Sequence, residues 1–76
     1  MKIEILGSGC KKCRNLAQNA ETAVARRGVD ATVEKVTDSD KIMEMGVAVT
    51  PALAIDGEVK SSGKLLTVEQ IEELLR

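Results

Sequence analysis

The stretch that decides the fold is residues 3–13, which read IEILGSGCKKC. Its first four residues have the near-continuous apolar character of a short parallel strand covered on both faces. A glycine-containing bend follows, and Cys10 and Cys13 then stand three positions apart at the start of a helical pattern. Two side chains so placed in a first helical turn lie roughly 5 to 6 Å apart at Cβ. The pair can therefore close and reopen a disulfide.

The direction of the chain makes the two sulfurs unequal. Cys10 falls where the helix begins, facing unpaired backbone N–H groups and the positive end of the helix dipole. Cys13, one turn deeper, is expected to turn toward the protein. Helix N-termini, neighbouring cations and C-x-x-C spacing all lower a cysteine pKa from its free value of about 8.5. Cys10 is thus the predicted nucleophile and Cys13 the predicted resolving thiol.

Three basic residues, Lys11, Lys12 and Arg14, surround the cysteines at a helix end where the dipole favours acids. A unit charge about 6 Å from a thiolate contributes on the order of 1 kcal/mol at an effective dielectric of about 40 to 80. Lys11 and Lys12 are therefore predicted to tune the thiolate of Cys10. An ordinary solvated basic face is the alternative.

Composition excludes several classes of protein. The 76 residues predict one domain over residues 1–76, and the absence of aromatic side chains leaves an aliphatic core. Eleven basic against twelve acidic residues argue against a nucleic-acid binder, as does the lack of aromatic stacking platforms. No histidine is present for Cys-His catalysis or for metal ligation.

The chain opens without an apolar run of signal-peptide or membrane-spanning length, which predicts a cytoplasmic protein that does not associate with membranes. In a reducing compartment a C-x-x-C pair indicates redox or metal chemistry more than a structural staple.

The first half of the chain predicts a long helix, an edge strand and a short helix. The long helix starts at Lys11 and ends at Gly28. Alternating apolar and polar residues over 29–34 predict a half-buried strand at a sheet edge. The short helix ends at Gly46, and its two methionines, Met43 and Met45, are interpreted as core filler. The residues expected on the buried face of the long helix are Cys13, Leu16, Ala17, Ala20, Val24 and Arg27. The short helix is expected to have Asp38 or Ser39 as its cap, Asp40 in its first turn, and Ile42 and Met45 on one face.

The second half predicts a hairpin and a last helix. Residues 53–55 form a third strand, Asp56-Gly57 matches a two-residue type I′ turn, and residues 58–60 form a fourth strand that 61–64 break. Thr67 and Gln70 match a capping box for the last helix. The buried residues expected on that helix are Val68, Ile71, Leu74 and Leu75. The predicted order is β-α-β-α-β-β-α, a four-stranded mixed sheet flanked by three helices.

With this order, the chain resembles the thioredoxin superfamily in its minimal, glutaredoxin-sized form, and more narrowly the small prokaryotic redox-active disulfide proteins. The resemblance covers essentially the whole chain and is carried by residues 9–13, Gly-Cys-Lys-Lys-Cys, and residues 49–51, Val-Thr-Pro. Two features depart from the better-known thioredoxins: no Trp precedes the first cysteine, and Lys11-Lys12 replaces Gly-Pro. The Cys-Pro-Tyr-Cys site common in glutaredoxins is also absent.

The resemblance implies roles for three further residues. It implies a cis peptide bond before Pro51 that faces the cysteines, with the backbone of Thr50 binding an extended substrate; the residues alone indicate only a proline at a strand entry. Glu4, six residues before Cys10, matches a buried acid that accepts the proton of Cys13 in thioredoxins. A surface-reaching glutamate is the alternative.

The favoured function is a thiol-disulfide oxidoreductase without a bound cofactor or metal. Its expected partners are protein or small-molecule disulfides and a reductase or dithiol that supplies electrons, and the protein is expected to be a monomer. The main alternative is a Cu(I) or Zn(II) carrier that uses the same two thiolates. Such carriers have the order β-α-β-β-α-β, which conflicts with the predicted last helix. An interaction module with inert cysteines, and an iron-sulfur cluster shared by two chains, are further alternatives.

Overall fold

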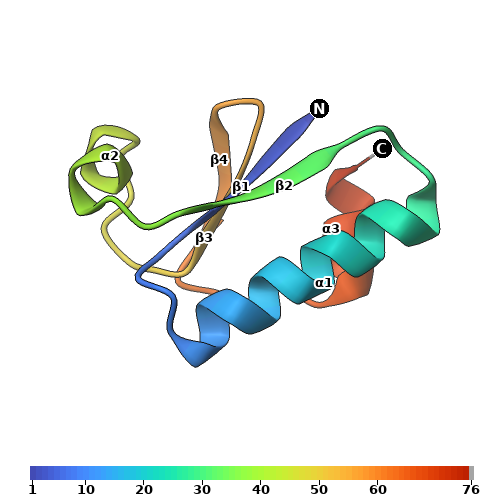
Figure 1. The fold of residues 1–76 in the computed structure, drawn as a ribbon, viewed down its shortest axis with the longest axis horizontal. Coiled ribbons are helices and arrows are strands. Elements are labelled where there is room, and N and C mark those ends of the chain that lie inside the picture. The colour runs from blue at the N-terminus through green and yellow to red at the C-terminus, as the bar shows by residue number, and fades with distance from the viewer. Residues whose placement is uncertain (76) are drawn as a thin grey trace.

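The computed structural model describes residues 1–75 and has the predicted order of elements (Figure 1). The elements are β1 (Lys2–Leu6), α1 (Lys11–Arg27), β2 (Thr32–Val36), α2 (Ser39–Glu44), β3 (Ala52–Ile55), β4 (Glu58–Ser62) and α3 (Val68–Leu74). The strands form one sheet in the order β2-β1-β3-β4. β1 pairs parallel with β2 and antiparallel with β3, and β3 pairs antiparallel with β4. The predicted mixed sheet and the edge position of the second strand are confirmed.

The sheet carries a core on each face because side chains alternate along β1. Ile3 and Ile5 pack with residues of α1 and α3, whereas Leu6 packs with Ile42 of α2. Figure 1 shows α1 and α3 side by side, with α2 apart from them at the other end of the sheet. Within residues 1–75, no helix is long and apolar enough to cross a membrane.

Helix α1 begins and ends at the predicted residues. Cys10 is its N-cap, and Gly28 ends it with a φ of 67°, a left-handed conformation that glycine adopts without strain. The prediction that Arg27 lies on the buried face is wrong, because Arg27 is exposed and Ala23 completes the buried stripe. The cationic side chain of Arg27 stays in solvent and interacts favourably with the negative end of the helix dipole in the last turn.

The second strand lies later in the chain than residues 29–34. β2 starts at Thr32, whose N–H donates to the carbonyl of Met1, and its parallel register starts at Lys2. Strand pairing can begin only where β1 begins, so Val29 and Ala31 precede the strand. They still contribute to the core, because both pack partly buried against the α1 and α3 side of the sheet.

Helix α2 is capped by Asp38, whose side chain accepts the N–H of Asp40 at 2.9 Å. The interpretation of Met43 as core filler is wrong, because this side chain is 72% exposed. The helix has only six residues and buries Ile42 alone, so the next position points to solvent. Met45 is half-buried and packs against the α2-side core, as expected.

The hairpin has the predicted type I′ turn, with φ values of 51° at Asp56 and 86° at Gly57. β4 runs on to Ser62 instead of breaking at residue 61, because a register shift opposite Leu53 and Ala54 leaves Lys60 as an extra residue and lets pairing resume.

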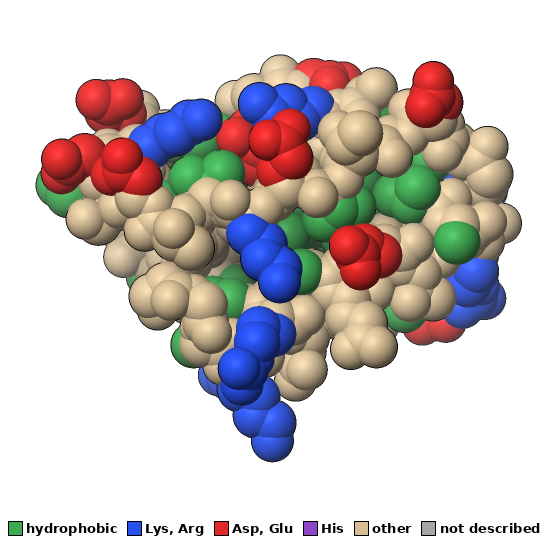
Figure 2. All heavy atoms as spheres, viewed as in Figure 1, with side chains coloured by type: hydrophobic (Ala, Val, Ile, Leu, Met, Phe, Trp, Pro, Cys, Tyr) green, Lys and Arg blue, Asp and Glu red, His purple; other side chains and the backbone are tan. Residues whose placement is uncertain are grey.

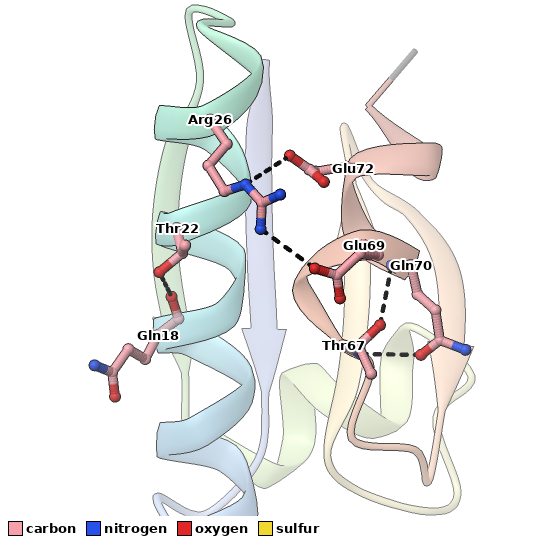
Figure 3. A network of polar contacts seen from close by, with 7 residues as sticks. All are labelled: Gln18, Thr22, Arg26, Thr67, Glu69, Gln70 and Glu72. Atoms are coloured by element: carbon pink, nitrogen blue, oxygen red, sulfur yellow. Dashed lines mark hydrogen bonds and ion pairs between the residues drawn. The ribbon is translucent and has the colours of Figure 1, made fainter.

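The capping box of α3 is confirmed and is drawn in Figure 3. The Gln70 N–H donates to Thr67 Oγ1 at 3.1 Å, and the Thr67 N–H donates to Gln70 Oε1 at 2.9 Å. In the same view, Arg26 of α1 lies between two carboxylates of α3, at 3.3 Å from Glu69 and 3.3 Å from Glu72. These contacts join the helix that carries the cysteines to the C-terminal helix.

Candidate active site

The end of β1 positions the two cysteines. The Gly7 N–H donates to the carbonyl of Val36 at 3.0 Å, which holds the chain against the end of β2. A bend through Ser8 and Gly9 then turns the chain into α1. Cys10 has the extended backbone of an N-cap, and α1 starts at the next residue. The cysteine pair therefore lies at the carboxyl end of β1, where open α/β sheets usually place their sites.

The two sulfurs differ in exposure and in hydrogen bonding. Cys10 is exposed and Cys13 is 5% exposed, and both are free thiols. Their Sγ atoms lie 2.8 Å apart and share a hydrogen bond, in which either can be the donor. The backbone N–H of Cys13 also donates to the Sγ of Cys10, at 3.4 Å. Cys10 thus has the accessible sulfur, and Cys13 the sheltered one immediately behind it.

These hydrogen bonds lower the pKa of Cys10 below its ordinary value. The hydrogen bond with the Cys13 thiol is the largest cause of the lowered pKa, and the Cys13 backbone N–H is the second. Loss of hydration opposes the shift in the pKa, while the backbone N–H groups of Lys12 and Cys10 add to it. A thiol at the start of a helix is therefore stabilised as a thiolate.

The loop before β3 lies beside this pair. The Thr50–Pro51 peptide bond is cis, as the resemblance implied, and Pro51 is buried while Thr50 is exposed. A side chain at Gly7 would contact both the Sγ of Cys13 and the Cβ of Thr50, so Gly7 lies against the cysteine and the proline loop together. The proposed substrate-binding loop and the dithiol are thus neighbours.

The structure places the other predicted site residues as follows. Lys11 and Lys12 are exposed in the first turn of α1, next to Cys10. Glu4 is 5% exposed, and its carboxylate lies 3.7 Å from the Nζ of Lys41 on α2. Glu4 therefore faces α2, whereas Cys13 belongs to the helix that covers the other face of β1. The structure does not bring the carboxylate of Glu4 into the cavity that borders Cys13.

Sequence analysis missed Gly7 and part of that cavity. A methyl group at Gly7 would overlap the Sγ of Cys13, so only glycine leaves room for the sulfur. The cavity has a volume of about 150 Å³ and is lined by Ile5, Gly7, Gly9, Cys13, Arg14, Lys35 and Thr37. Lys35 and Thr37 carry no local signal of a site, because their position depends on where β2 ends.

An exposed thiol with a lowered pKa, a sheltered partner thiol and a neighbouring cis-proline loop, set on this sheet, define a thiol-disulfide oxidoreductase with a thioredoxin-like fold. The comparisons with known proteins agree with this class. A family model described as thioredoxin domain matches residues 1–76.

Two proteins named thioredoxin are similar to almost the whole chain. The thioredoxin of Methanothermobacter thermautotrophicus is 44% identical over 75 residues, covering 99% of this chain and 97% of the relative. That of Methanocaldococcus jannaschii is 43% identical over 74 residues, covering 97% of this chain and 85% of the relative. The chain belongs to the thioredoxin family.

This membership and the observed fold disagree with the metal-carrier alternative. The carrier order has a strand as its fourth element, a helix as its fifth and a strand as its last, whereas within residues 1–75 the fourth element here is α2, the fifth is β3 and the last is α3. The family assignment implies substrates that contain disulfides and a reductase that returns electrons to the protein.

Proposed function

We propose that Cys10 is the nucleophile and Cys13 the resolving thiol in the reduction of substrate disulfides. The Cys10 thiolate attacks one substrate sulfur, an S–S bond forms between them, and the substrate's own S–S bond breaks to release a thiolate. Cys13, after losing its proton, then attacks the Cys10 sulfur. The bond between Cys10 and the substrate breaks, and the substrate sulfur that was bonded to Cys10 leaves as a thiolate. Two electrons pass to the substrate, whose two sulfurs take up two protons, and the protein keeps the Cys10–Cys13 disulfide.

The observation that carries this proposal is the inequality of the two sulfurs. Cys10 is exposed and accepts the hydrogen bonds that lower its pKa. Cys13 is 5% exposed and has its Sγ 2.8 Å from that of Cys10. An incoming disulfide can reach only the first sulfur, and the second is already in position to attack the resulting mixed disulfide.

Trapping the mixed disulfide tests the assignment. A Cys13→Ser variant should accumulate a mixed disulfide with an oxidised model peptide, and mass spectrometry should locate the bond at Cys10. A Cys10→Ser variant should accumulate little under the same conditions, because its remaining thiol is buried. Equal trapping by the two variants would overturn the assignment of roles.

We also propose that Lys11 and Lys12 add to the stabilisation of the thiolate. Both are exposed beside Cys10, and their charges have the sign that favours a thiolate. Replacing both with Glu should move the pH profile of Cys10 alkylation to higher pH and slow disulfide exchange. Replacing Arg27 alone with Glu, at the far end of α1 and outside the ion pairs of residues 1–75, reverses a charge on the same helix and is the control. An unchanged profile in the first variant would remove this electrostatic contribution.

The remaining expectations stay predictions with direct tests. A monomeric protein should give a single species of monomer mass in analytical ultracentrifugation. A cytoplasmic protein should be recovered in the cytoplasmic fraction of its cells.

A proton-accepting role for Glu4 requires relay through water, since its carboxylate faces Lys41. If that role exists, Glu4→Gln should slow the release of the mixed disulfide without changing the alkylation profile of Cys10.

A further inference from the structure

The cavity beside Cys13 combines an apolar floor with a cationic mouth. Its floor is formed by Ile5, two glycines and the Cys13 side chain, and its remaining lining residues are Arg14, Lys35 and Thr37. All three of these are exposed residues. The volume of about 150 Å³ is that of a side chain and not of a large cofactor. The Sγ of Cys13 is 2.8 Å from the Sγ of Cys10, the attacking atom. A group in this cavity that contacts the Cys13 side chain therefore lies close to the attacking sulfur.

The two cations at the mouth have no acidic partner among residues 1–75. Ion pairs in that part of the chain engage Lys2, Arg26, Lys41 and Lys60. Arg14 and Lys35 take part in none of them, nor do Lys11 and Lys12.

Figure 2 shows the consequence for the surface. Lys and Arg side chains run from the end of the molecule where α1 begins toward the middle of this face, and Asp and Glu side chains lie at the end that Figure 1 labels α2 and also across the upper part and the middle of the face. A cation that no internal carboxylate neutralises is free to pair with a carboxylate that arrives with a ligand.

We infer that this cavity is a specificity subsite for an acidic side chain of the substrate polypeptide, close in sequence to the substrate's disulfide cysteine. The methylene groups of an Asp or Glu side chain suit the apolar floor, and its carboxylate meets Arg14 and Lys35 at the mouth. The inference rests on the proposed function, because it places the subsite relative to an attack by Cys10. A polypeptide is the source of the carboxylate, since Val49, next to the proline loop, is 58% exposed and offers an apolar contact on the same substrate.

The experiment uses oxidised peptides that differ only in one residue. A neutral peptide pair joined by a disulfide is made with Glu, or with Gln, at each of the three positions on either side of the cysteine. The reduced protein is mixed with each pair, and the single-turnover rate of reduction is measured by chromatography. At one or two positions the Glu peptide should react about fivefold faster than its Gln partner at low salt, the size of effect that one or two partly exposed ion pairs produce. The ratio should fall toward one as salt is added.

Three variants separate the cavity from general charge. Arg14→Gln with Lys35→Gln removes the cations at the mouth and should bring the Glu-to-Gln ratio close to one. Thr37→Leu narrows the cavity without changing charge and should also reduce the ratio. The control is Arg27→Gln, which removes a cation without an ion-pair partner among residues 1–75 from the same helix, about 20 Å from Arg14. It should keep the ratio of the unmodified protein.

The outcomes are distinct. A ratio near one at every position for the unmodified protein overturns the inference but not the proposed function, provided that both peptides are reduced. A ratio that survives Arg14→Gln with Lys35→Gln, or that Arg27→Gln lowers equally, also overturns it, because the preference then comes from net charge. Failure to reduce any peptide would overturn the proposed function itself. Thermal unfolding of each variant, followed by circular dichroism, checks that the fold is retained.

Discussion

Replacing Gly7 with Ala should uncouple the two cysteines. Gly7 is the one glycine among residues 1–75 whose backbone lies outside the left-handed region, so alanine can adopt its conformation. The obstacle is space, since the new methyl group would overlap the Sγ of Cys13. The Cβ atoms of Cys13 and Thr50 lie at 3.5 and 3.7 Å from the same point, which is ordinary contact. The sulfur alone must therefore move.

The size of the effect follows from this geometry. Ordinary contacts between non-bonded heavy atoms lie at roughly 3.5 to 4.0 Å, so the sulfur must shift by on the order of 1 Å. Overpacking of this kind costs about 1 to 3 kcal/mol in the free energy of unfolding. Closure of the disulfide requires the sulfurs to approach from 2.8 Å to roughly 2.05 Å. Misplacing one sulfur by about 1 Å should slow resolution of the mixed disulfide by roughly 10- to 100-fold.

Two measurements check the argument. Stopped-flow kinetics with an oxidised peptide should show a mixed disulfide that persists in the Gly7→Ala variant, while Ser8→Ala, an exposed neighbour, should behave as the unmodified protein does. Urea denaturation of the reduced protein should then be compared in a Cys13→Ala background, where the sulfur is gone and the new methyl group has room. If Gly7→Ala costs the same stability with and without the Cys13 sulfur, the overlap is not the cause and the reasoning is refuted.

Three further predictions concern the groups around this centre. In a Cys13→Ala variant the Cys10 pKa should rise, because its strongest hydrogen bond is lost, and the alkylation profile of Cys10 should move to higher pH while retaining part of the shift from the backbone N–H. Lys41→Met should lower the free energy of unfolding by about 1 to 2 kcal/mol in urea titrations, because it leaves the Glu4 carboxylate buried without its cation. Adding Glu4→Gln to this variant should recover most of the lost stability, because the buried charge is then removed. Arg26→Ala removes two partly exposed ion pairs to α3 and should cost no more than about 1 kcal/mol by the same titration; a larger loss would mean that the residue also packs between the helices.

The parts of the site that depend on local sequence were predictable. Cys10 stands at the start of a helical pattern and becomes the N-cap of α1. Its exposure and the hydrogen bond that it accepts from the Cys13 N–H therefore follow from local spacing. The capping box at Thr67 and the turn at Asp56 are local in the same sense. The cis bond before Pro51 was available only through the family resemblance, because residues beside a proline seldom specify its isomer.

Several features that the sequence did not predict depend on where the strands begin and end. The start of the second strand was placed too early because the alternation of residues 29–34 is real, but β1 offers no partner before Lys2. The same register carries Lys35 to the cavity beside Cys13, a position that no periodicity could reveal. Met43 was misplaced because a helix of six residues buries too few positions for a pattern to identify its face.

The difference between the two cysteines therefore has two origins. The helix start gives Cys10 its hydrogen bonds, but it does not decide that Cys13 is sheltered or how near its sulfur lies. Those properties come from Gly7, which brings backbone instead of a side chain against the Cys13 sulfur and is itself fixed to β2 through Val36. A helix with the same C-x-x-C on a strand ending in a larger residue would keep an activated first thiol but would lose the placement of the second. In this chain, the backbone hydrogen bond to Cys10 follows from local sequence, whereas the position of the Cys13 sulfur follows from the packing of β1 against α1.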